Sequence, residues 1–316
     1  MIKFISSNQP AAQIVTVLLV FANIFIFIFT EHNFQQSLVH FHDASRYANL
    51  WDIPMISFAV NVLLILFSVI LVSYIFNSRE FFDKNTYLPG FFYFVLLSFF
   101  KESLTDYDFI LGLTLFLLAM HQILKIKQNE DARKISFDAV FLIGIAVFFN
   151  PLYAFFLPFF WIALNSVRPF VWREMALSIA GFLCALLIIY IFSPEVNLIK
   201  EEYIFSHSEA QELRFLFFII SFFLFMGFAV IYLLKYSSRT SIRFKRLVRM
   251  LFILLFFGIF SASAYWLNFK ATFQFALIIA PASFLFAIPI LYTKSNKIAN
   301  YLLWLVLVCS FLVYFF

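Results

Sequence analysis

Long apolar runs separated by short polar segments organise almost the whole chain. Eleven runs can be recognised, at 12–30, 53–76, 88–100, 109–126, 135–149, 151–167, 175–192, 215–234, 250–268, 273–292 and 301–316. Runs of about 17 to 25 apolar residues are typical of transmembrane helices, whereas the strands of a membrane barrel alternate apolar and polar residues. The pattern predicts an all-α polytopic transmembrane bundle of about eleven spans, forming one domain over residues 1–316.

Two of these runs are short for a hydrocarbon core of about 30 Å. Runs 88–100 and 135–149 each fit either a short helix shielded by its neighbours or one arm of a re-entrant hairpin. For the first run we expect true spans, because a hairpin would place the charges of segment 101–108 inside the membrane, where each is costly. The second run ends at the uncharged turn Asn150-Pro151, and both arrangements of 135–167 stay open.

Basic residues are distributed unevenly between the two sets of alternating loops. Counted from the N-terminus, 17 of the 22 lysines and arginines fall in the first set, while eleven of the 17 acidic residues fall in the other. Lysine and arginine accumulate in cytoplasmic loops. We therefore expect a cytoplasmic N-terminus and an outward-facing C-terminus.

Composition supports a membrane protein and excludes several other classes. The chain is 64% hydrophobic and 12% charged, against about 25% charged residues in soluble domains. Its net charge of +5 is explained by the cytoplasmic loops, so we expect membrane lipids as partners and no nucleic acid. The sequence contains no phosphate-binding glycine loop and no metal-ligand motif; it predicts no metal site and leaves any cofactor unknown. With six glycines, a transporter built on closely packed glycine helices is disfavoured.

The predicted outer loops contain the candidate catalytic residues. Loop 31–52 contains Glu31 and Asp43, and the next outer segment contains Glu102. A carboxylate at a membrane surface can act as a general base. Asp43, Glu31 and Glu102 are therefore the candidate catalytic acids.

Three nearby cationic or titratable residues could contact a lipid phosphate. Arg46 follows His42 by four residues, so a helix would place both on one face, and Lys101 lies beside the predicted second outer turn. The alternative is that 31–52 forms an interfacial amphipathic helix with no active site. Both interpretations stay open.

One stretch of the chain resembles a known family. The segments Ile135–Ala146 and Arg168–Glu174, followed by Gly181, resemble uncharacterised multi-pass bacterial inner-membrane proteins of about 300 residues. Some members of that family are labelled beta-carotene monooxygenase. The resemblance covers about 85–192 and implies a multi-pass protein of the bacterial inner (plasma) membrane.

A fainter similarity connects the chain with membrane glycosyltransferases that use polyprenyl-phosphate sugars. Those enzymes also begin inside, cross about eleven times and carry a catalytic acid in the first outer loop. The similarity implies a lipid-linked substrate handled at the outer face. The alternative is a non-enzymatic lipid transporter or a membrane subunit of an envelope-assembly complex, with other envelope membrane proteins as partners.

Overall fold

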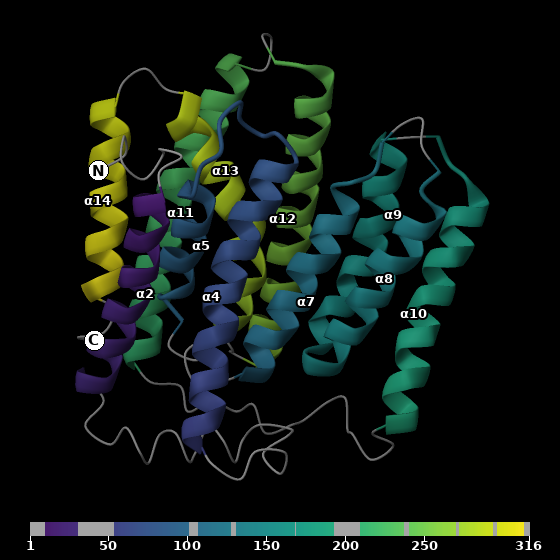
Figure 1. The fold of residues 1–316 in the computed structure, drawn as a ribbon, viewed down its shortest axis with the longest axis horizontal. Coiled ribbons are helices and arrows are strands. Elements are labelled where there is room, and N and C mark those ends of the chain that lie inside the picture. Colours follow the sequence, from purple (N-terminus) through teal and green to yellow (C-terminus); the bar gives the residue numbers. More distant parts are fainter. Residues whose placement is uncertain are drawn as a thin grey trace. The chain divides into compact units, whose positions relative to one another are not determined.

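The computed structural model describes residues 10–30, 54–100, 107–127, 131–167, 169–192, 209–236, 240–269, 272–292 and 296–312. Within these ranges it is all helical, with eleven α-helices and two 3-10 helices (Figure 1). Each predicted run corresponds to one α-helix, so the all-α fold class is confirmed. Five candidate spans are long and apolar enough to cross a bilayer: Phe58–Ser78, Trp172–Ile191, Leu213–Lys235, Ile242–Leu267 and Gln274–Tyr292. The chain is a polytopic membrane protein. Eleven crossings and the orientation stay predictions.

The helices form two compact units, each assembled from separate stretches of the chain. Unit 1 comprises residues 1–107, 206–240 and 279–316, and unit 2 comprises 108–205 and 241–278. Because the two sets of stretches alternate along the sequence, the division does not mark two consecutive domains. The single domain stays a prediction.

Two short helices lie at the centre of unit 1. They are α5 (Leu88–Leu97), which is completely buried, and α13 (Ile279–Tyr292), which is buried as far as Ile290; the two pack against each other. Further contacts join α4 (Pro54–Ser78), α2 (Pro10–Thr30) and α14 (Asn296–Leu312) to α5, and α11 (Glu209–Tyr236) to α13. Ten residues make α5 about 15 Å long, half the thickness of a hydrocarbon core. All ten are buried, so this short helix is shielded by its neighbours.

Phenylalanine rings fill the core of unit 1. Phe286 of α13 contacts Phe92 of α5 at 6.1 Å between ring centroids, and Phe225 and Phe222 of α11 at 5.1 and 5.9 Å. Phe76 stacks on Phe81 at 5.0 Å. Much of the aromatic content of the chain therefore serves helix packing.

In unit 2, helices α8 (Arg133–Phe149) and α10 (Trp172–Phe192) pack closely through glycines. The unit also comprises α7 (Tyr107–Ile123), the 3-10 helix η2 (Pro151–Phe155), α9 (Phe156–Val167), α12 (Ile242–Phe269) and the 3-10 helix η4 (Thr272–Ile278). A Cβ added to Gly181 of α10 would lie 2.7 Å from the Phe137 carbonyl oxygen of α8, and one on Gly144 would lie 2.5 Å from the Ala185 Cβ. Five of the six glycines would place a Cβ at 3.0 Å or less from a neighbour. Few glycines therefore suffice for close helix contacts when most of them lie at those contacts. That a glycine-packed transporter is disfavoured stays a prediction.

The turn between α8 and α9 is buried. Asn150 is 6% exposed, its side chain accepts a hydrogen bond from the Leu152 amide at 3.0 Å, and it donates to Gln274 Oε1 at 2.6 Å. The 17 residues of α8 give about 25 Å and η2 with α9 about 28 Å, lengths close to a full crossing. A re-entrant hairpin over 135–167 nevertheless stays open, because the position of the membrane is not determined.

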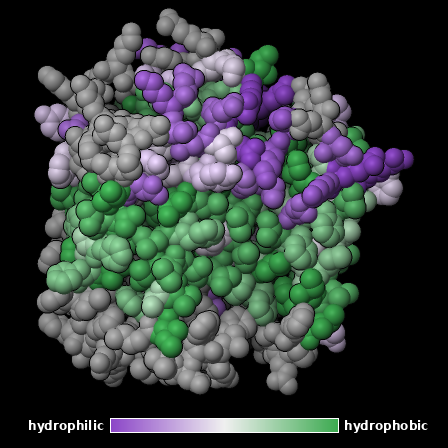
Figure 2. Space-filling model, viewed as in Figure 1, coloured by the Kyte–Doolittle hydropathy of each residue, from purple (hydrophilic) through white to green (hydrophobic). Residues whose placement is uncertain are grey.

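Apolar side chains cover the middle of the described helices on their exposed faces. Ile14, Leu18, Phe21 and Phe25 of α2 are each at least 50% exposed, and their spacing puts them on one helical face. Figure 2 shows hydrophobic residues along the helices and hydrophilic residues gathered near helix ends. This distribution is the one that a lipid environment requires.

Candidate functional site

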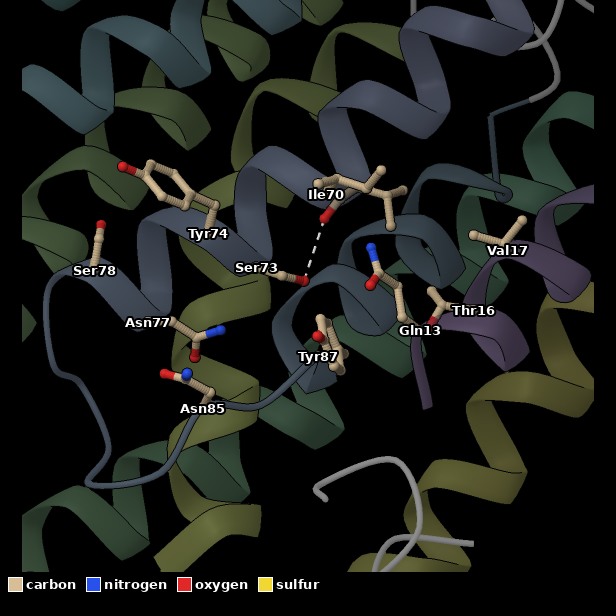
Figure 3. Close-up of a pocket in the computed structure, with 11 residues that line it drawn as sticks. Gln13, Thr16, Val17, Ile70, Ser73, Tyr74, Asn77, Ser78, Asn85 and Tyr87 are labelled. Atoms are coloured by element: carbon tan, nitrogen blue, oxygen red, sulfur yellow. Dashed lines mark hydrogen bonds between the residues drawn. The ribbon is translucent and has the colours of Figure 1, made fainter. Parts of the chain in front are cut away.

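A pocket of about 450 Å³ lies in unit 1, where the first turns of α2 meet the last turns of α4 and the start of α5 (Figure 3). The volume is typical of small-molecule sites, about 300–1,000 Å³. Most of its lining side chains are polar and uncharged: Gln13, Thr16, Ser73, Tyr74, Asn77, Ser78, Asn85 and Tyr87. The remaining lining residues, Val17, Val69 and Ile70, are apolar.

Helical spacing brings the polar residues of α2 and α4 to the pocket. Gln13 and Thr16 are three residues apart on α2, and Ser73 and Asn77 are four apart on α4, so each pair lies on one face. Figure 3 shows Gln13 extending from α2 into the space between the helices. Gly90 allows α5 to approach this part of α4, because a Cβ there would lie 2.6 Å from the Val69 carbonyl oxygen.

Hydrogen bonds hold the loop from α4 to α5 at the edge of the pocket. The Asn77 side chain donates to the Thr86 carbonyl oxygen at 3.1 Å and accepts from the Thr86 amide at 3.0 Å. Thr86 Oγ1 accepts from the Leu88 amide at 3.3 Å, which caps α5. The loop is further fixed by Tyr292, whose hydroxyl donates to the Phe81 carbonyl oxygen at 3.0 Å. These bonds place Asn85 and Tyr87 in the lining.

Some lining side chains are engaged in the fold and others are available. Ser73 and Ser78 donate to the Val69 and Ile75 carbonyl oxygens at 3.3 and 3.0 Å. In the described part of the chain, the side chains of Gln13, Asn85 and Tyr87 make no hydrogen bond. Their two amides and one phenol supply donors and acceptors that a ligand could use in place of water.

The surroundings of the pocket change from apolar to polar along the helix axis. Exposed apolar side chains of α2 and α4, such as Leu18 at 59% and Phe67 at 50%, continue from it along the helices. At the other side lies the α4–α5 loop, where the exposed polar residues Glu80, Asp83 and Lys84 occur. The pocket therefore lies at helix ends, between exposed apolar helix faces and a polar loop.

The described lining supplies amides, alcohols and two phenols. Among the described residues it contains no carboxylate, histidine, lysine or arginine side chain. Within the described ranges, no three His, Cys, Asp or Glu side chains come together as metal ligands would.

The predicted site residues lie outside the described residues. Segment 31–53 contains Glu31, Asp43, His42 and Arg46, and segment 101–106 contains Lys101 and Glu102. The structure therefore neither brings them together nor separates them. Their catalytic and phosphate-binding roles stay predictions.

The pocket residues were missed by the search for catalytic motifs. Their sequence signal is weak but recognisable: the polar pairs Gln13/Thr16 and Ser73/Asn77 interrupt the ends of otherwise apolar helices at helical spacing. What the sequence does not show is that the two helix ends face one another across the loop containing Asn85.

Comparisons with family models, with curated proteins and with solved structures find no match. The two resemblances drawn from the sequence stay predictions, and the geometry of unit 1 has to support a function by itself.

Proposed function

We propose that this polytopic membrane protein binds and handles an amphipathic lipid, whose polar group occupies the pocket of unit 1. The observation that supports the proposal is the junction of two surfaces. An uncharged polar pocket opens beside exposed apolar side chains of α2 and α4. A lipid presents the same sequence of chemistry, with a polar group followed by hydrocarbon.

The proposed handling is non-enzymatic at this pocket. The described lining supplies mainly amides and alcohols, which bind a ligand through hydrogen bonds, and its two titratable groups are the phenols of Tyr74 and Tyr87. A lipid transporter or a membrane subunit of an envelope-assembly complex in a bacterial inner membrane fits such a binding site. Other envelope membrane proteins are then its proposed partners.

The enzymatic form of the proposal is a glycosyltransferase-like protein with its site at the outer face. It depends on Asp43, Glu31 and Glu102 as catalytic acids. By the distribution of basic residues, loop 77–87 is predicted to be cytoplasmic and 31–52 to be outside. The pocket and these acids would then lie on opposite sides of the membrane, so lipid binding in the pocket does not require them.

Filling the pocket tests the proposal. Gln13→Trp places a bulky ring in the hollow, and Gln122→Trp is the matched control, since Gln122 is also half-buried and near a helix end, in α7 of unit 2. The full chain is purified gently from membranes, and its co-purified lipids are quantified by mass spectrometry. We expect Gln13→Trp to retain at least threefold less of one lipid class than either wild type or Gln122→Trp. Equal lipid retention by all three proteins contradicts a lipid site at this pocket.

A further inference from the structure

The charges of the lining side chains limit the chemical class of ligand that the pocket can bind. A phosphate or carboxylate is held in proteins by arginine, lysine or a metal ion, and an ammonium group by carboxylates or aromatic cages. Among the residues that the structure describes, the lining contains neither cationic nor anionic side chains. Taking a charged group out of water without such a partner is costly.

The charges at the edge of the pocket also sum to zero. In the loop that follows α4, Arg79 and Lys84 are matched by Glu80 and Asp83. These four charges cancel, so they produce no net field favouring an anion or a cation at the entrance. An uncharged ligand therefore meets no electrostatic penalty at the edge or inside.

The available hydrogen-bonding groups select for hydroxyls. An amide presents an acceptor and two donors, and a phenol presents one of each; Gln13, Asn85 and Tyr87 thus offer both kinds to the hollow. An alcohol group both donates and accepts, so it can satisfy such mixed partners. Ser73 donates its proton to the Val69 carbonyl oxygen and so keeps its own oxygen as an acceptor for a ligand hydroxyl.

From these features we infer that the pocket binds an uncharged, hydroxyl-rich headgroup, that of a glycosyl lipid, through Gln13, Asn85 and Tyr87. The inference rests on the proposed lipid-handling function and specifies its ligand class. The sugar lies in the hollow among the amides, and the acyl chains follow the exposed apolar faces of α2 and α4. The same hydroxyl chemistry occurs in free sugars, but these would leave the apolar flanks of the pocket unused.

Headgroup selection can be measured on the wild-type chain. The protein is reconstituted in phosphatidylcholine vesicles containing equal amounts of glucosyl diacylglycerol, diacylglycerol and phosphatidylglycerol. After re-extraction, the bound lipids are compared by native mass spectrometry, and free glucose is added as a competitor in a parallel sample. We expect glucosyl diacylglycerol to be retained about tenfold over diacylglycerol, as one or two uncharged hydrogen bonds provide, and also over phosphatidylglycerol. Glucose should displace it only at a large excess.

Variants of the lining residues test whether the headgroup preference arises in this pocket. Gln13→Leu and Asn85→Leu should each reduce the preference for glucosyl diacylglycerol by about three- to tenfold, whereas Gln122→Leu should leave it unchanged. Equal retention of diacylglycerol, or a preference for phosphatidylglycerol, overturns the headgroup assignment while a Gln13→Trp-sensitive lipid site still stands. Displacement by glucose at concentrations similar to those of the glycolipid, or lipid retention insensitive to Gln13→Trp, overturns the lipid-handling function as well.

Discussion

Polar side chains are used differently at two places in this protein, the buried turn of unit 2 and the pocket of unit 1. In unit 2, polar groups pair with each other: Asn150 donates to Gln274, which is 4% exposed, and the Trp161 indole donates to Ser178 at 2.8 Å. In the pocket of unit 1, the side chains of Gln13 and Asn85 have no hydrogen-bond partner among the described residues. Pairing removes the cost of burying polar groups, whereas the half-buried Gln13 and the exposed Asn85 can exchange water for a ligand.

Two helix contacts, one in each unit, are also made by different side chains. In unit 2, the α8–α10 pair is in close contact through Gly144, Gly181 and Ala185. In unit 1, aromatic rings join α5, α11 and α13, and the ends of α2 and α4 leave a hollow. The comparison teaches that the polar residues of a membrane core should be assessed by their partners, because composition alone does not distinguish a structural amide from a binding one.

The largest loss of stability is expected from a substitution at the tightly packed contact between α8 and α10 in unit 2. Gly181→Leu would force a side chain against the Phe137 backbone of α8, which cannot move aside as a flexible side chain could. We expect the free energy of unfolding to fall by about 3 kcal/mol, the upper end of overpacking costs. Thermal unfolding of the purified chain in detergent measures the loss. Gly227→Leu in unit 1 is the control, because a Cβ there meets nothing within 4 Å; an equal loss at both glycines would show that the α8–α10 contact is not a tight one.

A smaller loss in the free energy of unfolding is expected from replacing side-chain amides, and its size should differ between the two units. Asn150→Leu or Gln274→Leu leaves a buried amide without its partner, so each should lower the free energy of unfolding by about 1–3 kcal/mol. The double variant should lose less than the sum, since both members of the pair are gone. Gln13→Leu and Asn85→Leu should change stability by no more than about 0.5 kcal/mol. Chemical or thermal unfolding of all five variants decides the matter, and a pocket change as costly as Asn150→Leu would remove the distinction between the units.

The helical fold was predictable because hydrophobic periodicity and length are local properties. Every predicted run corresponds to an α-helix, including the short run 88–100, whose helix ends at Leu97. Tertiary effects were not predictable in the same way. The buried position of α5 depends on helices from distant parts of the chain, and the close contacts at Gly144 and Gly181 depend on where these glycines lie and not on how many the chain has.

The candidate pocket was not predicted from the sequence. The residues chosen from the sequence were charged ones, such as Asp43 and Arg46, because charges are conspicuous in an apolar chain. Uncharged residues such as Gln13 and Asn85 attract no attention until a fold places them around one hollow. They are 72 positions apart in the sequence, and no short motif connects them.

The smallest effect is expected within unit 1 itself, at a polar group that is paired. Tyr292 at the end of α13 donates its hydroxyl to the Phe81 carbonyl oxygen at 3.0 Å, and its ring contacts Phe82 edge-on at 5.1 Å between centroids. Tyr292→Phe keeps the ring contact and removes the hydrogen bond, so the free energy of unfolding should fall by about 0.5–1.5 kcal/mol. The α4–α5 loop should also loosen, which can be followed as faster limited trypsin cleavage at Arg79 and Lys84. Tyr301→Phe is the control, because Tyr301 is 74% exposed. If trypsin cleavage and stability are unchanged in both variants, the loop is held without the Tyr292 hydrogen bond. Pairing of polar groups would then not stabilise the edge of the pocket as it does the turn at Asn150 in unit 2.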